Sequence, residues 1–543
     1  MTDGQHADRL LSLADASLRA GQYRQGARQL AEASRLAPAH RGVAAAIRQA
    51  AGQARTLMQQ QRAALAWQIL GPLADLPNAD AGVLALCGHA AMACGENEAA
   101  ISAFQRWSQL VPDDPEAALR LAAALADHGQ AERAEQVVSQ VLVRHRESAT
   151  AHFVLGRALL GQARFEAAEQ AFRAVVRLQP GHHLAQNNLL ELVWMRSGDP
   201  ARATEALDQA LAANPGLVQL RIAKAKLWSS LMQWNEALRE IRAGLAVSAE
   251  HPELLAAAAQ VALHVDGHLA VDYAGRLHDR LPSRAARALL GNAYLAAGRA
   301  ELALPIAQAL HRDDAGDGQA VAMLADAMRM LGDAGYRDLL DYRGLVRAEY
   351  IDCPRGWPSR NAYLDELRRD LRALHTLHAH PVASSLRGGS QAQLDPQHSP
   401  CASLRAFPEA VDGPVRRYVD ALGQGPDPMR SRVARGHLIR GMWSVRLRSE
   451  GFHLNHYHPG GWISSAFYLV LPPVRSMHSG GGWLKFGEPA FPTSPRLDAE
   501  YFVRPEPGLL VLFPSFLWHG TVPFAGEQDA ERITIAFDVL PVR

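Results

Sequence analysis

The sequence predicts a protein of two parts, an all-helical repeat array followed by a β-rich domain of the sandwich or barrel type. Two observations predict this. Small residues and prolines recur with a fixed period through roughly the first 340 residues, and near residue 345 this alanine-rich pattern stops. From Trp443 onward, short apolar runs alternate with Gly/Pro turns, as they do in β proteins.

The repeat is clearest in residues 81–112 and 149–180. Each segment has Gly at its eighth position, Ala at its twentieth and Pro at its thirty-second. Pro112 and Pro180 stand 180 − 112 = 68 residues apart, which is two periods of 34. Small side chains let two antiparallel helices cross closely, and the proline ends the second helix. The pattern therefore predicts stacked helix pairs.

This pattern resembles the tetratricopeptide repeat. The resemblance covers about residues 7–340 and predicts about nine or ten repeats. Residues 44–78 and 253–283 fit the frame poorly and are assigned only by spacing. A solenoid of this kind offers an extended surface, so we expect it to bind a protein or peptide.

The second domain is expected at residues 345–543, with its core at 440–543. A helical pattern at about 360–378 precedes a Gly/Ser/Gln/Pro-rich stretch at 383–402. The clearest strand-like runs follow at residues 463–471, 509–513 and 533–539.

Composition excludes several classes of partner. The 56 Lys and Arg residues nearly balance the 55 Asp and Glu residues, so the net charge of +1 gives no general attraction to nucleic acid or an anionic membrane. The sequence has no long apolar run and no signal-peptide pattern at its start, which predicts a cytoplasmic location. The four cysteines form no CxxC pair. The oligomeric state is left open.

Histidines crowd one short segment of the β-rich part. His453, His456 and His458 precede one predicted strand, and His519 follows a later one. Arg532 opens the last strand, thirteen residues after His519.

This order suits a facial-triad iron site. Two ligands two residues apart on one strand end share a face, and a third comes from a distant strand. Three ligands on one face leave positions open for a bidentate 2-oxo acid and O₂. An arginine nearby can bind the far carboxylate of that acid through two parallel hydrogen bonds.

Five sequence blocks resemble a bacterial family of 2-oxoglutarate/Fe(II) oxygenases that often carries tetratricopeptide repeats in front. The blocks are HYHPGGWISS, GWLKFGEP, PGLLVLFPS, WHGTVPF and RITIAFD. The family is more distantly similar to prolyl and aspartyl/asparaginyl hydroxylases. The resemblance implies a double-stranded β-helix (jelly-roll) fold, Fe(II) and 2-oxoglutarate. It also implies His456 and His519 as metal ligands and Arg532 as the 2-oxoglutarate anchor.

One position departs from the usual oxygenase pattern, because His458 stands where a carboxylate is common. His458 can be a third imidazole ligand, or the site can hold only two histidines. Glu488 or Asp538 can supply a carboxylate from elsewhere, although their spacing does not show it. Without a carboxylate ligand, redox tuning shifts to groups around the ligands.

Other residues near these blocks have weaker assignments. Ser464 and Tyr468 share a strand face and, with Thr534, are candidates for contact with 2-oxoglutarate, although Tyr468 can equally be a core residue. His453 is not expected to bind metal, because its position differs in strand parity from that of His456. His478 is expected in a loop.

The sequence therefore predicts a non-haem Fe(II)/2-oxoglutarate oxygenase that hydroxylates a protein or peptide recruited by the repeats. Two alternatives stay open. The chain can be a repeat scaffold whose β-domain only binds a ligand, or a cupin-like metalloenzyme that does not use 2-oxoglutarate.

Overall fold

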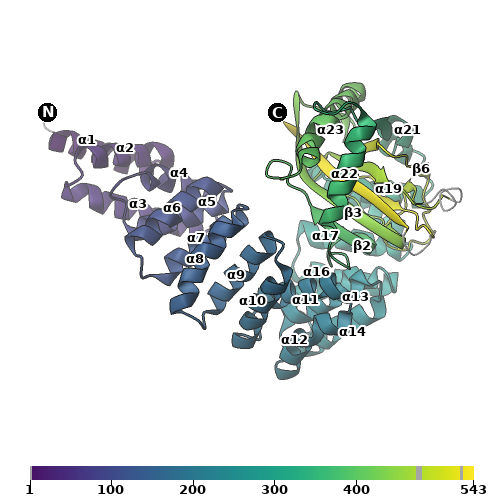
Figure 1. The fold of residues 1–543 in the computed structure, drawn as a ribbon, viewed down its shortest axis with the longest axis horizontal. Coiled ribbons are helices and arrows are strands. Elements are labelled where there is room, and N and C mark those ends of the chain that lie inside the picture. Colours follow the sequence, from purple (N-terminus) through teal and green to yellow (C-terminus); the bar gives the residue numbers. More distant parts are fainter. Residues whose placement is uncertain (1–2, 473–479, 526–529, 543) are drawn as a thin grey trace. The chain divides into compact units, whose positions relative to one another are not determined.

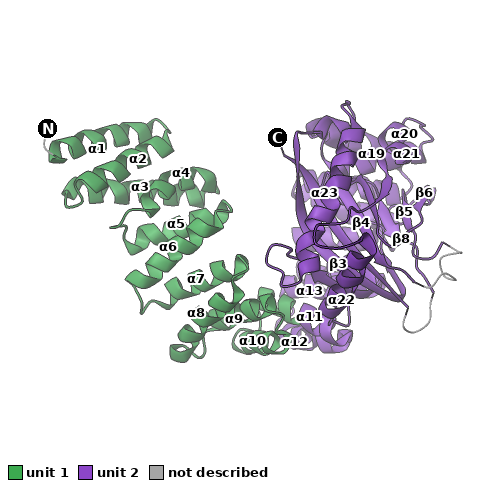
Figure 2. Ribbon diagram, turned by 45° about the horizontal axis from the view of Figure 1, so that its top comes forward, with its two compact units in different colours: residues 1–189 green, residues 190–543 purple. Residues whose placement is uncertain are grey.

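The computed structural model describes residues 3–472, 480–525 and 530–542, and His478 lies outside them. The chain divides into two compact units, residues 1–189 and 190–543 (Figure 2). This division differs from the change in composition near residue 345. The reason is that the later helical repeats pack on the β-rich domain, as shown below.

The first unit consists of antiparallel helix pairs (Figure 1). Its helices are α1 (Asp3–Arg19), α2 (Tyr23–Leu36), α3 (Arg41–Gln59), α4 (Ala63–Ala74), α5 (Ala81–Ala93), α6 (Asn97–Leu110), α7 (Pro115–Asp127), α8 (Ala131–Arg144), α9 (Ala149–Gly161) and α10 (Phe165–Leu178). Asp80 and Ser148 cap the N-termini of α5 and α9 through side-chain oxygens that accept backbone N–H groups.

Helical pairs continue across the boundary into the second unit. They are α11 (His183–Ser197), α12 (Pro200–Ala213), α13 (Val218–Ser230), α14 (Trp234–Val247), α15 (Pro252–Ala262), α16 (Gly267–Arg280), α17 (Arg284–Ala296), α18 (Ala300–Asp313) and a last single helix, α19 (Gly318–Met330). The repeat solenoid is confirmed. The two stretches whose sequences fit the repeat frame poorly also form helix pairs. The first of them, α3 and α4, departs from the frame because α3 is long, at 19 residues, and α4 is short, at 12 residues.

The small residues stand where helices touch. A Cβ atom at Gly88 would overlap the ring of Phe104 in the partner helix, and one at Gly156 would overlap the ring of Phe172. Ala100 and Ala168 are fully buried. The repeat pattern therefore reflects close helix packing, as predicted.

The β-rich domain consists of two antiparallel sheets. Its strands are β1 (Arg347–Tyr350), β2 (Leu386–Gln393), β3 (Gly436–His453), β4 (Ile463–Val470), β5 (Leu484–Phe486), β6 (Tyr501–Val503), β7 (Leu509–Pro514), β8 (His519–Thr521) and β9 (Glu531–Val542). One sheet has the order β1-β7-β4-β9-β3-β2 and the other β6-β5-β8. The expected β domain is confirmed, and the double-stranded β-helix topology stays a prediction.

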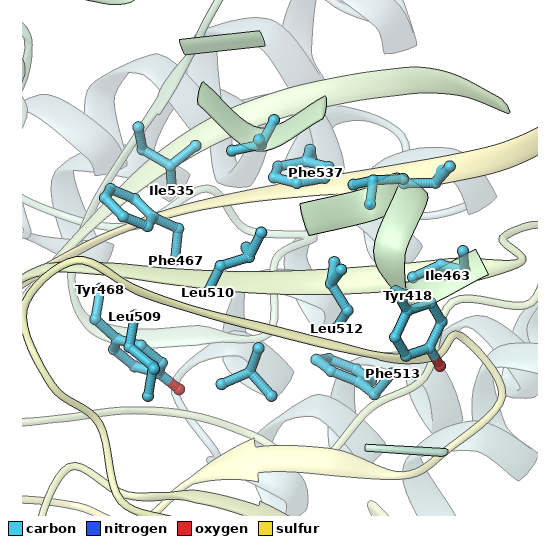
Figure 3. Close-up of a cluster of buried hydrophobic side chains, with 14 of the residues drawn as sticks. Tyr418, Ile463, Phe467, Tyr468, Leu509, Leu510, Leu512, Phe513, Ile535 and Phe537 are labelled. Atoms are coloured by element: carbon cyan, nitrogen blue, oxygen red, sulfur yellow. The ribbon is translucent and has the colours of Figure 1, made fainter. Parts of the chain in front are cut away.

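Two helices, α22 (Arg360–Leu374) and α23 (Ala402–Leu422), complete the core of this domain, and the short helices α20 (Tyr336–Leu339), α21 (Tyr342–Leu345) and η1 (Arg430–Arg432) lie in its connections. Phe407 of α23 packs on Phe467 of β4, with ring centroids 5.2 Å apart. Side chains of β4, β7 and β9 fill the same cluster (Figure 3).

The repeats of the second unit hold a segment of the β-rich domain. The carbonyl of Met195 in α11 accepts the backbone N–H groups of His378 and Ala379, at 2.8 and 2.9 Å. The indole N–H of Trp194 donates to the carbonyl of His380 at 2.8 Å. The segment after α22 is therefore fixed along α11 by main-chain hydrogen bonds.

Within the described part of the chain, no helix is long and apolar enough to cross a membrane.

Candidate metal centre

Two of the candidate ligands, His456 and His519, are joined by backbone hydrogen bonds. His456 lies in the connection between β3 and β4, and His519 opens β8. The N–H of each residue donates to the carbonyl of the other, both at 2.9 Å. This isolated antiparallel bridge fixes the spacing of the two imidazoles before any ion binds.

The third histidine completes a compact cluster. The ring centroids of His456 and His519 are 4.2 Å apart, and that of His458 lies 5.2 and 5.3 Å from them. One nitrogen from each ring lies within 4.8 Å of the others. The structure thus brings together the three histidines selected from the sequence.

Hydrogen bonds determine which nitrogen each ring offers. The Nδ1 atom of His456 lies 2.8 Å from the carbonyl of Leu454, and that of His519 lies 2.9 Å from the carbonyl of Leu517. A carbonyl can only accept, so each Nδ1 carries the proton and each Nε2 has a lone pair. In both rings Nε2 is thus the nitrogen that could bind a metal ion.

The Nδ1 of His458 donates to a carboxylate. Asp538 Oδ1 lies 2.7 Å from it and also accepts the hydroxyl of Ser464 at 2.7 Å. Metal-ligating histidines are commonly oriented by such a carboxylate. Asp538 is therefore placed behind His458, and Ser464 belongs to the same hydrogen-bond group.

Burial keeps the imidazoles of His456 and His519 neutral at neutral pH. It lowers the pKa of His456 to about 4, with the nearby His458 as a second cause. Burial also lowers the pKa of His519 well below its usual value. Since a metal ion binds the neutral ring, both histidines are ready to bind at neutral pH.

Glu488, the other candidate carboxylate, lies outside the cluster. It forms an ion pair with Lys485 and faces Arg496 at 3.6 Å. His453 lines the cavity beside the cluster, with its Nδ1 3.0 Å from the hydroxyl of Ser385.

A cavity of about 280 Å³ connects the histidines with Arg532. Its lining includes His456, His458, His519, Arg532, Thr534 and Trp443. The guanidinium of Arg532 lies over the ring of Tyr468, 5.0 Å from its centroid, and the residue is only 2% exposed. Burial lowers the pKa of Arg532, which reflects the cost of a charge held away from water.

Arg532 is also short of partners. Within the described residues, its Nε and Nη1 have no hydrogen-bond acceptor, and no carboxylate forms an ion pair with it. Burying a guanidinium without an ion-pair partner costs folding free energy, and the binding of an anion would offset that cost. The cavity thus combines a possible metal site with a site for an anion.

Comparison with known families agrees with this arrangement. Residues 441–538 match the family model described as "Putative 2OG-Fe(II) oxygenase". Residues 88–151, 119–183 and 153–218 match the tetratricopeptide repeat. The chain therefore joins a segment that matches the tetratricopeptide repeat to a segment that matches the family described as "Putative 2OG-Fe(II) oxygenase". The matched oxygenase segment contains all three histidines and Arg532.

Several solved structures are similar to part of this chain. MamA from Desulfovibrio magneticus RS-1 is 21% identical, with 31% of this chain and 95% of that chain covered and a TM-score of 0.28. TTC0263, a repeat protein of Thermus thermophilus, is 22% identical, with 36% and 99% covered and a TM-score of 0.27. YrrB, described as having an unusual peptide-binding site, is 19% identical, with 32% and 90% covered and a TM-score of 0.26. No curated protein matches the chain.

Sequence reasoning missed two residues beside the histidines. Ser385 reaches within 3.3 Å of the Nε2 of His456 from a segment 71 residues away. Trp443 lies with its ring centroid 6.0 Å from that of His458. Neither belongs to a recognisable motif, and only the pairing of β2 with β3 brings their strands together.

Proposed function

We propose that this chain is a non-haem Fe(II)/2-oxoglutarate-dependent oxygenase that hydroxylates a protein or peptide. The observation that supports this most is the shared cavity. Its lining includes three clustered histidines and a buried arginine without an anionic partner among the described residues. A metal site and a carboxylate site in one cavity suit a co-substrate that bridges them.

His456, His458 and His519 would hold the iron. Each Nδ1 is engaged by a carbonyl or carboxylate, which leaves three Nε2 atoms for one ion. When bound, Fe(II) with 2-oxoglutarate supplies the O₂-dependent oxidation of a C–H bond. The histidines fix the position of that chemistry at one wall of the cavity.

Asp538 supplies negative charge without being a ligand. Its hydrogen bond to the Nδ1–H of His458 makes that imidazole a stronger donor toward metal. This offers a physical reason why a histidine can stand where related oxygenases have a carboxylate. Ser464 holds Asp538 in place through its own hydrogen bond, and we propose this role for it in place of contact with 2-oxoglutarate.

Arg532 binds the far carboxylate of 2-oxoglutarate in this proposal. Its guanidinium has unpartnered donors among the described residues and can present two parallel N–H groups along one edge to a carboxylate, and Thr534, which also lines the cavity, adds a hydroxyl. Tyr468 is fully buried and packs under the guanidinium. The site therefore orients the co-substrate and excludes water.

The repeats support a macromolecular substrate. Tetratricopeptide repeats serve as protein-binding surfaces, and the first unit consists of them. We propose that they recruit the protein or peptide whose residue is hydroxylated in the cavity.

The test is anaerobic binding of Fe(II), followed by titration with 2-oxoglutarate. The parent protein should bind about one Fe(II) and then 2-oxoglutarate, whereas His456→Ala and His519→Ala should bind no iron. His375→Gln is the matched control, because His375 is also buried but bonds Ser390 and Ser444 away from the cluster. Iron binding without 2-oxoglutarate binding would favour the cupin-like alternative. A parent that binds neither would favour the scaffold.

A further inference from the structure

The last repeat helix, α19, is shared between the repeats and the β-rich domain. Its Val321 and Ala325 lie in the hydrophobic core of that domain. Its Ala322 and Met323 lie in the core of the preceding repeats, together with Trp518 and Phe491 of the β-rich domain. A helix that belongs to two cores has little freedom to move against either.

One residue of α19 is a buried acid. Asp326 is 1% exposed and accepts a hydrogen bond from the indole N–H of Trp518 at 2.8 Å. Its other oxygen has no hydrogen-bond partner within the described residues. Burial raises the pKa of Asp326 to about 7. Such a group is costly to keep in a core, and among the described residues the bond to Trp518 is its one side-chain hydrogen bond with the β-rich domain.

Trp518 directly precedes His519 in the chain. Its ring packs edge-on against Tyr457, with centroids 4.5 Å apart and planes at 80°. Tyr457 stands between His456 and His458. Each of the three histidines is therefore covalently next to a residue of this aromatic pair.

A second contact with the β-rich domain lies at the N-terminus of α19, at Gly318. A Cβ atom at Gly318 would come 3.2 Å from Phe516 Cβ and 3.5 Å from Pro459 Cα. Pro459 follows His458, and Phe516 comes three residues before His519. The start of α19 thus abuts both segments that carry the histidines, while Asp326, further along the helix, accepts the indole N–H of Trp518.

We propose that Asp326 is a positioning residue of the metal centre, acting through its hydrogen bond to Trp518 on the orientation of His519 and, through Tyr457, of His456 and His458. The inference rests on the proposed function, because it assumes that these histidines bind the metal. It assigns the final repeat a role in metal binding in addition to recruitment.

The experiment uses the full chain with Fe(II) for affinity and Co(II) for the visible spectrum, which reports ligand geometry. Asp326→Leu and Trp518→Phe each remove the hydrogen bond and should weaken metal binding about tenfold and alter the Co(II) spectrum. Asp326→Asn keeps an acceptor oxygen and should restore both affinity and spectrum to about the parent values. In the double variant Asp326→Leu/Trp518→Phe the losses should not add, because one bond is removed in both singles.

The matched control is Trp194→Phe. Trp194 is also buried, and its indole N–H also donates at 2.8 Å across the contact between a repeat helix and the β-rich domain, but to His380. Its loss should leave metal affinity and spectrum unchanged. Thermal unfolding of the metal-free proteins checks the fold, and if Asp326→Leu does not fold, the comparison of Trp518→Phe with Trp194→Phe decides.

The two proposals fail in different ways. A parent protein that binds no metal would refute the proposed function. If the parent binds metal and Trp518→Phe binds it with the same affinity and the same Co(II) spectrum, Asp326 is not a positioning residue. Equal losses in Trp518→Phe and Trp194→Phe would also overturn the proposal, because they would indicate general loosening of the contact.

Discussion

Replacing Arg532 by Met should have opposite effects on ligand binding and on the metal-free fold. Methionine keeps an unbranched apolar side chain that reaches about as far as Nε of the arginine, but it has neither charge nor donor. In the parent, the guanidinium of Arg532 has nitrogens without a hydrogen-bond partner among the described residues, and each charge-assisted hydrogen bond to an anion contributes on the order of 1.5–3 kcal/mol. Two such bonds together contribute about 3–6 kcal/mol, so the affinity for 2-oxoglutarate should fall roughly 100- to 20,000-fold.

The metal-free protein should not lose stability in the same variant. Arg532 is 2% exposed, so its removal relieves an unpaired buried charge. We expect the unfolding temperature of Arg532→Met to equal or exceed that of the parent. Arg532→Lys keeps the charge without the fork and should bind 2-oxoglutarate with intermediate affinity.

The assay is titration of the anaerobic Fe(II) protein with 2-oxoglutarate, with iron content measured in parallel. Arg446→Met is the control. Arg446 lies on β3 opposite Ile533, but its Nε is 2.8 Å from the carboxylate of Glu531, so its loss should leave 2-oxoglutarate affinity unchanged. Binding by Arg532→Met within about threefold of the parent would show that Arg532 does not anchor the co-substrate.

Three further outcomes are expected. Asp538→Asn should weaken Fe(II) binding roughly 10- to 100-fold in equilibrium dialysis, since it removes the charge behind His458, and unchanged binding would exclude that role. Burial raises the pKa of Asp326 from its usual 3.8 to about 7 in the folded protein, so between these pH values only the unfolded chain loses the proton. The free energy of unfolding of the parent should therefore fall as pH rises from about 4 to about 7, by at most about 4 kcal/mol. Asp326→Asn should lack this fall in thermal unfolding across that pH range, and parallel profiles would contradict the assignment. A fragment of residues 190–543 should fold and bind Fe(II), whereas a fragment of residues 345–543 should aggregate because its apolar contacts with the repeats become exposed. Circular dichroism measures the folding and light scattering the aggregation, and a folded, monomeric 345–543 fragment would contradict this prediction.

Three of the β strands that line the site, β4, β7 and β9, could be predicted from the sequence. The apolar runs at β4, β7 and β9 have the length and composition of buried strands, and the structure places strands there. β2 was missed because its sequence, LRGGSQAQ, has two glycines and no β-branched residue. Its strand conformation comes from pairing with β3, a tertiary effect that local pattern does not reveal.

Helix α23 was also missed, for a different reason. Pro408 and Pro414 stand inside it, and proline in a helix interior removes a hydrogen bond and argues against a helix. Burial of Phe407 and Tyr418 on the sheet outweighs that local cost.

The candidate site was predictable only in part. The spacing of His456 and His458 shows in the sequence, because both belong to one short segment. Ser385 and Asp326 reach the site from other elements, and Asp326 meets Trp518 across 192 residues. Such neighbours leave no local signal, so the sequence indicated the candidate ligands but not the groups that we propose orient them.

The contacts of α11, α13 and α19 with the β-rich domain constrain how this chain can change in length. Trp194 and Ser230 both contact His380 of that domain, whereas Asp326 contacts Trp518. Gain or loss of one 34-residue repeat between Trp194 and Asp326 would move one contact out of register with the others. A repeat gained or lost before residue 189 would leave all three in place. We therefore expect a change in repeat number to be tolerated before residue 189, and we expect the number of repeats from α11 to α19 to be constrained by their contacts with the β-rich domain.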